Sequence, residues 1–417
     1  MQTAQPTTTP AGTWWPDRYQ ELVEQRQTLL DRCGPIVAGF SATTDALHPV
    51  EAGGLGRLLA ATASAPEVAE GLATVQEWLR TGRDGELFID DHAAEPLLEE
   101  LLGPPTRVQC GGTSIQAAWS WSELGLEPLL ALRNRSARQL RATPDGVRLA
   151  VGDGVAPART VTATSGAPVP SNHVLELARG LRAGGVEVTR SSRITVVMAR
   201  KRLQLDEDFL HRSPDFVAGG VGLVSGLNGL ARATSEEVLG VVAGAVAAWR
   251  EAGARLVHLE LAEYARPGEL SRVMAQVGPH VDSVGMNAGE LTRLLGAGHP
   301  AHVAAQFAAA FGLRRVVVHA DRWAMSVHRG DPRTEERALA AGSLAAANRA
   351  EHGSPRGQWR VPDAARFAVE IPEAGSAAES YRVSAVATPY LAQPRSTIGL
   401  GDTFVSGDLL VHAGTET

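Results

Sequence analysis

A glycine turn followed by a carboxylate lies near the C-terminus of this chain. Residues 396–407 read STIGLGDTFVSG, and they come after an apolar run at 383–388. The turn opens an apolar segment at 403–412, so we expect a strand, a glycine turn and a helix in that order. Gly399 and Gly401 would leave backbone amides free at the helix N-terminus, where the macrodipole also favours negative charge. This pattern predicts an anion site that suits a phosphate.

Asp402 directly follows the turn. A carboxylate beside a bound phosphate can accept the proton of an attacking hydroxyl group, which is the chemistry of phosphoryl transfer. Aspartate is also a favoured N-cap of helices. The Gly-x-Gly-Asp spacing by itself favours the cap, so a catalytic role for Asp402 depends on the other elements of the chain.

Polar or glycine residues also follow two segments in the N-terminal half. Asp45 comes shortly after the apolar strand predicted at 36–40, and ligands of open α/β sheets bind at the carboxyl ends of strands. Asp45 is therefore a candidate acceptor for a substrate hydroxyl, although an aspartate there is more often a turn or cap residue. Gly111 and Gly112 precede a helix rich in alanine and tryptophan. They either bring the backbone close to a ligand or turn the chain tightly.

Three later strands also carry or end in polar residues. His258 and Glu260 alternate within the strand 255–261 and so share one face of it. An ionisable pair in an apolar strand needs a partner or a ligand, and a hydrogen-bonded core histidine is as common as a functional one. Asn287 and Glu290 follow the strand 281–286 with the spacing of a capping box. His319 ends the strand 316–319.

The composition places the chain among ordinary globular proteins. It has 417 residues, 44% of them hydrophobic, and a formal net charge of -7, so nothing favours a nucleic-acid or membrane partner. Its cysteines, Cys33 and Cys110, exclude a disulfide framework and a cysteine-based zinc cluster. Residues 1–13 are rich in Thr and Pro and predict a disordered tail rather than a signal peptide. We expect a cytoplasmic protein without a membrane span.

The order of apolar segments predicts an α/β protein. From about residue 170 onward, apolar strands alternate with helices, which indicates a mostly parallel sheet covered on both faces. Within this part we expect a helix at 173–183 and an irregular surface segment at 338–364. Short runs separated by Gly, Pro and Asp at 86–165 predict β-structure apart from the main sheet. The expected domains are a tail at 1–13, the start of a large α/β domain at 14–85, a mostly β lid at 86–165, and the large nucleotide-binding and catalytic domain at 166–417.

In this order, the motifs resemble the ADP-dependent glucokinase and phosphofructokinase family, which has the ribokinase-like fold. The resemblance covers about residues 36–407. It rests on the strand leading to Asp45, Gly111-Gly112, Ser225-Gly226-Leu227, His258-x-Glu260, Asn287-x-x-Glu290, Val318-His319 and the run from Thr397 to Thr403. It implies a doubly covered, mostly parallel sheet with a smaller β-rich lid. It also implies a Mg²⁺-dependent phosphoryl transfer from ADP to a sugar hydroxyl, with release of AMP.

The resemblance further implies roles for individual residues. Asp402 would be the base, and the backbone of Gly399, Leu400 and Gly401 would stabilise the transferred phosphoryl group. The remaining implied roles are sugar binding by Asp45, Gly111 and Gly112, nucleotide binding by His319 and Thr397, and Mg²⁺ binding by Glu260, Asn287 and Glu290.

The acceptor is left open, because the sugar side departs from the family pattern. Thr113 stands after the double glycine where Gln or Asn is common, and hydroxyl residues stand near Asp45 where asparagines are usual. The cations Arg193, Arg200, Lys201 and Arg202 would neutralise a phosphate on fructose 6-phosphate, although a solvated charged edge is the more common reason for such a cluster. The alternative functions are an ATP-dependent carbohydrate or nucleoside kinase and a non-catalytic sugar- or nucleotide-binding descendant. The oligomeric state is not predicted.

Overall fold

The computed structural model describes residues 14–89, 94–164, 169–197, 203–228, 230, 235–264, 268–376 and 380–414. The predicted tail at 1–13 and the cations Arg200, Lys201 and Arg202 lie outside these residues. Within the described part of the chain, no helix combines the length and the apolar character that crossing a membrane requires.

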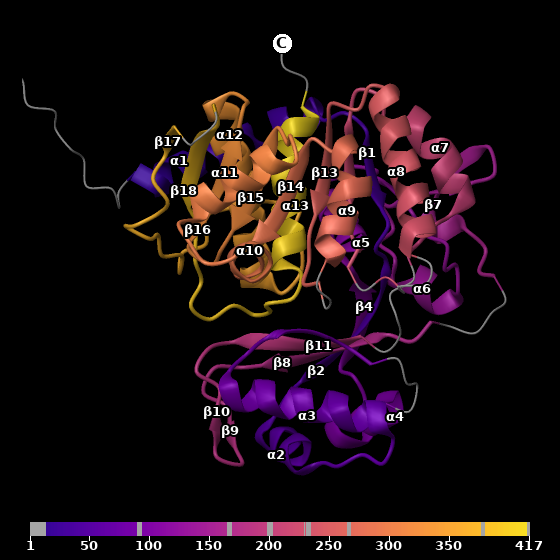
Figure 1. The fold of residues 1–417 in the computed structure, drawn as a ribbon, viewed down its shortest axis with the longest axis vertical. Helices are drawn as coiled ribbons and strands as arrows, with labels where there is room; N and C mark the ends of the chain where they lie inside the picture. The colour runs from indigo at the N-terminus through magenta and orange to yellow at the C-terminus, as the bar shows by residue number, and fades with distance from the viewer. Residues whose placement is uncertain are drawn as a thin grey trace, which may run out of the picture.

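A large sheet of eleven described strands forms the centre of the upper part of the molecule (Figure 1). The strands from β6 to β15 run parallel to their neighbours, and the strands at both edges are antiparallel. In spatial order they are β17 (Gly375–Ser376), β18 (Arg382–Ala387), β16 (Trp323–His328), β15 (Arg315–His319), β14 (Ser283–Asn287), β13 (Leu256–Glu260), β12 (Val221–Val224), β1 (Ile36–Gly39), β5 (Leu129–Leu130), β6 (Arg148–Val151) and β7 (Gly154–Pro157).

Helices cover both faces of this sheet, because its strands are apolar on both sides. In β1, Val37 packs into one core while Ile36 and Ala38 pack into the other. One core is shared with α7 (Glu207–Val217), α8 (Ser235–Glu251), α9 (Glu269–Gln276), α10 (Ala288–Leu295) and α11 (Pro300–Ala310). The other is shared with α1 (Trp14–Asp31), α5 (Thr113–Glu123), α12 (Pro332–His352) and α13 (Leu400–Ala413), and α6 (Ala137–Ala142) packs beside it. The predicted doubly covered, mostly parallel sheet is confirmed.

A smaller domain lies across one end of the large sheet (Figure 1). Its five-stranded sheet has the order β3 (Gly85–Phe88), β11 (Ser192–Val197), β8 (Asn172–Leu177), β2 (Thr43–Pro49) and β4 (Arg107–Gly111). On its outer face, residues such as Leu175 and Ile194 pack under α2 (Ala52–Ala60), α3 (Pro66–Thr81) and α4 (Ala94–Leu102). A short hairpin, β9 (Arg182–Ala183) and β10 (Val186–Glu187), adjoins it. The alternate residues, including Asp45, Asn172 and Arg193, face a cavity.

The expected lid at 86–165 is wrong in its bounds. The small sheet combines two separate stretches, 43–111 and 172–197, whereas β5, β6 and β7 belong to the edge of the large sheet. The expected borders of the large domain at 14–85 and 166–417 are wrong for the same reason. Short strands between turns look alike in a sequence, and only the pairing of β5 with the distant β1 assigns it to the large sheet.

Two local expectations are also wrong. The segment 173–183 begins with the strand β8 rather than a helix. In the segment 338–364, residues 338–352 form a largely buried part of α12 that packs against α13, so the surface expectation is wrong there. Residues 353–364 are irregular, with both exposed and buried positions. The small residues of α12 gave no apolar pattern typical of a buried helix. They allow α12 and α13 to approach closely, because a side chain at Gly342 would meet Phe404 and one at Gly407 would meet Ala341.

Candidate active site

A cavity of about 850 Å³ lies between the inner face of the small sheet and the carboxyl ends of β13, β14 and β15. Most of the residues singled out in the sequence line it, namely Asp45, Gly112, Glu260, Asn287, Glu290, His319, Gly399, Gly401 and Asp402. Three of the predicted residues are outside the lining, but each directly adjoins a lining residue in the chain, namely Gly111, Leu400 and Thr397. Parallel strands place their ends at one edge, which is why side chains far apart in the sequence meet here.

The glycine turn forms the N-terminus of α13. Gly399 is the N-cap and has a φ of 68°, a left-handed conformation that favours glycine. The bond from the Thr403 amide to the Gly399 carbonyl, 2.9 Å long, is the first of the helix. The amides of Leu400, Gly401 and Asp402 precede it and are therefore the orphan donors that an anion can use. The alternative that Asp402 caps the helix is wrong, because the cap is Gly399.

Asp402 is placed so that it can accept a proton. Burial raises the pKa of its carboxyl group above the ordinary value, and the charges of Arg349 and Arg193 oppose that rise. The side chain of Thr113, the first residue of α5, also lowers the pKa of Asp402. Because burial makes the ionised form costly, the group has a stronger affinity for a proton than a solvated aspartate has.

Asp45 lies within β2 and not in the loop that the sequence suggested. Its carboxylate rests on Gly111, where an added Cβ would be 2.0 Å from Oδ1. Asn172 Nδ2 donates to the same oxygen at 3.0 Å. Burial raises the pKa of Asp45 to about 7, so near neutral pH it can either accept or donate a hydrogen bond to a ligand hydroxyl. Gly111 thus contributes by making room for Asp45.

Glu260 holds two histidines at the floor of the cavity. Its Oε2 bonds His258 Nε2 at 3.0 Å, which confirms that the two residues share a face of β13, and its Oε1 bonds His319 Nε2 at 3.3 Å. Burial alone would raise the pKa of Glu260, but the bonds and charges of both histidines keep it below the ordinary value. Burial likewise opposes protonation of His319, yet Glu260 raises its pKa. His319 and Glu260 therefore form an ion pair when the imidazole is protonated.

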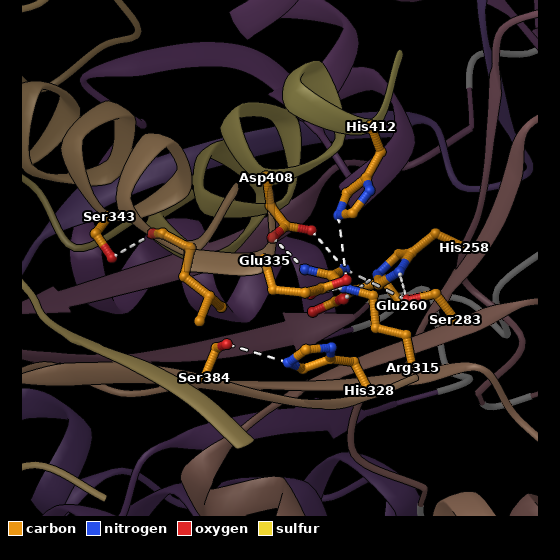
Figure 2. Close-up of polar contacts among 11 residues, drawn as sticks. His258, Glu260, Ser283, Arg315, His328, Glu335, Ser343, Ser384, Asp408 and His412 are labelled. Carbon is orange, nitrogen blue, oxygen red and sulfur yellow. Dashed lines mark hydrogen bonds and ion pairs between the residues drawn. The ribbon is translucent and has the colours of Figure 1, made fainter. Parts of the chain in front are cut away.

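Glu260 and His258 also belong to a buried network (Figure 2). His258 Nδ1 bonds Ser283 Oγ at 2.9 Å. The Arg315 guanidinium contacts the same hydroxyl and forms two bonds of 2.6 and 2.8 Å to Asp408 of α13. The network connects the cavity floor to the core of the large domain.

Asn287 and Glu290 form the capping box that their spacing in the sequence predicts. The Asn287 amide donates to Glu290 Oε2 at 2.8 Å, and the Glu290 amide donates to Asn287 Oδ1 at 2.9 Å. Burial raises the pKa of Glu290 to about 7. The cap uses Oε2, so Oε1 remains for another interaction.

The oxygen ligands near Glu290 suit Mg²⁺, which keeps water and phosphate ligands, better than they suit a metal ion bound entirely by protein side chains. Among the described residues, no cluster of three or more His, Cys, Asp or Glu side chains could enclose an ion. Mg²⁺ commonly binds through one or two carboxylates, water and substrate phosphates. Glu290 with its spare oxygen meets that requirement at the cavity wall. Glu260 already bonds a histidine with each oxygen, so it would mainly orient its neighbours.

The predicted nucleotide residues differ in their surroundings. The His319 ring lies beside Phe404, with ring centroids 4.9 Å apart, and close to Gly401. The Thr397 carbonyl accepts a bond of 2.8 Å from Arg193 of the small sheet. The neighbouring Ser396 hydroxyl donates to Glu176 of β8 at 2.9 Å. The glycine turn is therefore tied to both domains.

Several cavity residues were not found from the sequence. Asn172 and Gln116 line the cavity, and Arg349 lies directly behind the glycine turn. Arg349 belongs to the segment that was expected at the surface, and it is in no recognisable motif. The sequence presents Thr113 only as a departure from the family pattern, whereas in the structure its side chain lowers the pKa of Asp402.

Comparison with known proteins agrees with this architecture. The fold is similar to that of a phosphofructokinase from Pyrococcus horikoshii OT3 solved with AMP, with a TM-score of 0.69, 18% identity, and coverage of 92% of this chain and 98% of that chain. It is also similar to an ADP-dependent kinase in complex with fructose-6-phosphate and ADPβS, with a TM-score of 0.79, 16% identity, and coverage of 96% and 98%. At these identities the likeness establishes the fold alone.

A search of curated proteins finds no significant match. The family model described as the ADP-specific phosphofructokinase/glucokinase conserved region matches residues 64–411, which include every site residue predicted from the sequence except Asp45. Because this match covers most of the sequence, the chain belongs to the ADP-specific phosphofructokinase/glucokinase family.

Proposed function

We propose that this protein transfers the β-phosphoryl group of ADP to a hydroxyl group of a sugar and releases AMP. The observation that carries the proposal is the position of Asp402. It lies in the first turn of α13, beside free backbone amides, in the wall of a cavity that Asp45 lines from the other sheet. Membership of a family of ADP-specific sugar kinases supports it.

The reaction follows from these groups. The oxygen of the acceptor hydroxyl attacks the β-phosphorus, and the bond from that phosphorus to the bridging oxygen breaks. AMP leaves with the bonding electrons. Asp402 takes the proton of the hydroxyl as its oxygen forms the new bond. The amides of Leu400 and Gly401 donate to the phosphoryl oxygens, whose negative charge they stabilise together with the helix N-terminus.

The roles of the other residues follow from their places around the cavity. Glu290, with Asn287 beside it, would hold Mg²⁺, and Glu260 would orient the site through His319. When bound, Mg²⁺ neutralises charge on the phosphate oxygens. His319 and the turn at Thr397 would lie on the nucleotide side.

The small-sheet side of the cavity would bind the acceptor. Asp45 and Asn172 offer a carboxylate and an amide to sugar hydroxyls, Gly111 leaves room for the Asp45 carboxylate, and Gly112 lies in the cavity lining. The lining also contains the cations Arg133 and Arg193 and the carboxylate of Glu86. The first acceptors to compare are glucose, which has no phosphate, and fructose 6-phosphate, which carries one.

The decisive experiment measures AMP formed from ADP and Mg²⁺, with ATP in parallel, against glucose, fructose 6-phosphate, other sugars and nucleosides. The Asp402→Asn variant is the blank. We expect AMP only with ADP and one acceptor class. Turnover with ATP alone would replace the proposal with an ATP-dependent kinase. Nucleotide binding by calorimetry without turnover of either donor would identify a binding protein instead.

A further inference from the structure

Behind the glycine turn lies a buried cation that no motif predicted. Arg349 of α12 is 1% exposed. Its guanidinium presses on Gly399, where an added Cβ would lie 2.3 Å from Cζ. The same group is 5.5 Å from the centroid of the Trp119 ring of α5. Gly399 therefore has two reasons to be glycine, its left-handed φ and the guanidinium against it.

Arg349 joins the two helices whose N-termini face the cavity. Its Nη1 donates to Thr403 Oγ1 of α13 at 2.9 Å, and its Nη2 donates to Gln116 Oε1 of α5 at 2.8 Å. One planar group thus holds the glycine turn before α13 in register with the double-glycine turn before α5. The fork of a guanidinium can make both bonds at once, and an ammonium on a flexible stem makes them poorly.

The charge of Arg349 is not neutralised by a hydrogen-bonded acid. In the described part of the chain, its guanidinium donates to two neutral oxygens, and its Nε is buried without a hydrogen-bond partner there. Burial lowers the pKa of Arg349 to about 10, and the nearby carboxylate of Asp402 opposes that shift. Its positive charge acts on the carboxyl group of Asp402 and lowers the pKa of that group.

We propose that Arg349 is the positioning residue of the phosphoryl-transfer site, which fixes the glycine turn against α5 and supplies the buried positive charge that keeps Asp402 able to act as a base. This inference rests on the proposed function. It adds to it a residue outside the cavity lining that acts through Asp402 and the turn. The other charged groups that influence Asp402 are the cation Arg193, the carboxylates Glu260 and Asp45, and His319.

The test compares the pH dependence of kcat in wild type, Arg349→Met, Arg349→Lys and Arg333→Met. Removing the cation raises the pKa of Asp402, so the acid limb of kcat in Arg349→Met should move up by about one pH unit. kcat at neutral pH should fall at least about tenfold, while KM for ADP changes little. Arg349→Lys keeps the charge but loses the fork, so its limb should stay in place while kcat falls several-fold. Arg333 lies exposed at the other end of α12, and its variant should match wild type.

Gln116→Glu tests the charge without removing the arginine. The substitution places a carboxylate against the Arg349 guanidinium and neutralises it, at the cost of the bond from Gln116 to the Cys110 carbonyl. Its acid limb should also move up, and this variant carries the test if Arg349→Met does not fold. The inference would be overturned if the acid limb of kcat stayed in place in Arg349→Met and in Gln116→Glu, wherever these variants fold.

An activity-independent measurement separates this inference from the proposed function. The Asp402 carboxyl carbon can be titrated by ¹³C NMR, with Asp402→Asn to assign its resonance. If no donor turned over in wild type, the proposed function would fail, but the Asp402 titration should still move up in Arg349→Met and Gln116→Glu. A titration that did not move would refute the role of Arg349 whatever the enzyme transfers.

Discussion

In the described part of the chain, two buried arginines contact α13, and their environments are opposite. Arg315 contacts the middle of the helix through Asp408 and also bonds Glu335, and it is 2% exposed. Its carboxylate partners raise its pKa against the effect of burial. Arg349 contacts the N-terminal end, its hydrogen-bond partners among the described residues are neutral oxygens, and burial lowers its pKa to about 10. Arg315 is a balanced charge of the core, and Arg349 is an unbalanced charge beside the cavity.

The difference shows how one helix serves two purposes. Around Asp408 each charge has a partner of opposite sign, as the inside of a domain requires. Around Asp402 the hydrogen-bond partners of the Arg349 guanidinium in the described part of the chain are neutral, which suits the phosphate binding and proton transfer proposed for this end of the helix. Groups with perturbed pKa values are common at functional sites, because catalysis needs pKa values that differ from those of the same groups in water.

The largest expected effect separates the two aspartates of α13. Asp402→Asn should lower turnover by about 10²- to 10⁴-fold, since it removes the proton acceptor, while nucleotide binding and the melting temperature remain close to wild type. Asp408→Asn is the matched control and should mainly reduce stability, because it takes a partner from Arg315. Steady-state kinetics and thermal unfolding of both variants measure this. Full activity in Asp402→Asn would disprove the base.

Breaking the balanced end should unfold the protein more readily. Arg315→Met leaves Asp408 and Glu335 buried without their cation, so we expect a loss of about 3–5 kcal/mol in the free energy of unfolding. Denaturant titration measures it. A variant that adds Asp408→Asn and Glu335→Gln to Arg315→Met should recover part of the loss. If Arg315→Met cost no more than Arg349→Met, the distinction between the two arginines would be wrong.

The unbalanced side should also show itself in the pH dependence of stability. The folded pKa of Asp45 is about 7, well above the value of about 3.9 for a solvated aspartate. Wild type should therefore lose stability as the pH rises through this interval, because the folded state holds the proton more tightly than the unfolded state. Asp45→Asn removes that loss and should be the more stable protein at pH 8, by on the order of 2 kcal/mol. Melting temperatures that differ equally at pH 4 and pH 8 would contradict this.

The smallest expected effect tests whether Glu290 does more than cap α10. Glutamine at this position can keep the capping box, so Glu290→Gln should preserve the melting temperature while raising the magnesium concentration needed for half-maximal rate by about tenfold. Glu290→Ala should lose the cap as well, at about 1 kcal/mol. An unchanged magnesium titration in Glu290→Gln would leave the cap as the only role of Glu290.

Local patterns were enough to find the main parts of the site. The strand ends at His319 and Asn287, the alternation of His258 and Glu260, and the turn before Asp402 are all visible in the sequence, because strand period, turn chemistry and helix starts are encoded by neighbouring residues. Their order along the chain was also sufficient to indicate the family. The doubly covered parallel sheet followed from the alternation of apolar strands and helices.

Only the tertiary structure showed how these parts are assembled and how their charges influence one another. The small domain is assembled from two distant stretches, and the pairing of β5 with β1 assigns β5 to the large sheet. Asp45 lies on Gly111, and Arg349 lies behind Gly399. Burial and the charges of distant residues set the pKa values of Asp402 and Asp45. Sequence neighbours determine the period and the turns, whereas burial and charge balance depend on residues that only the fold brings together.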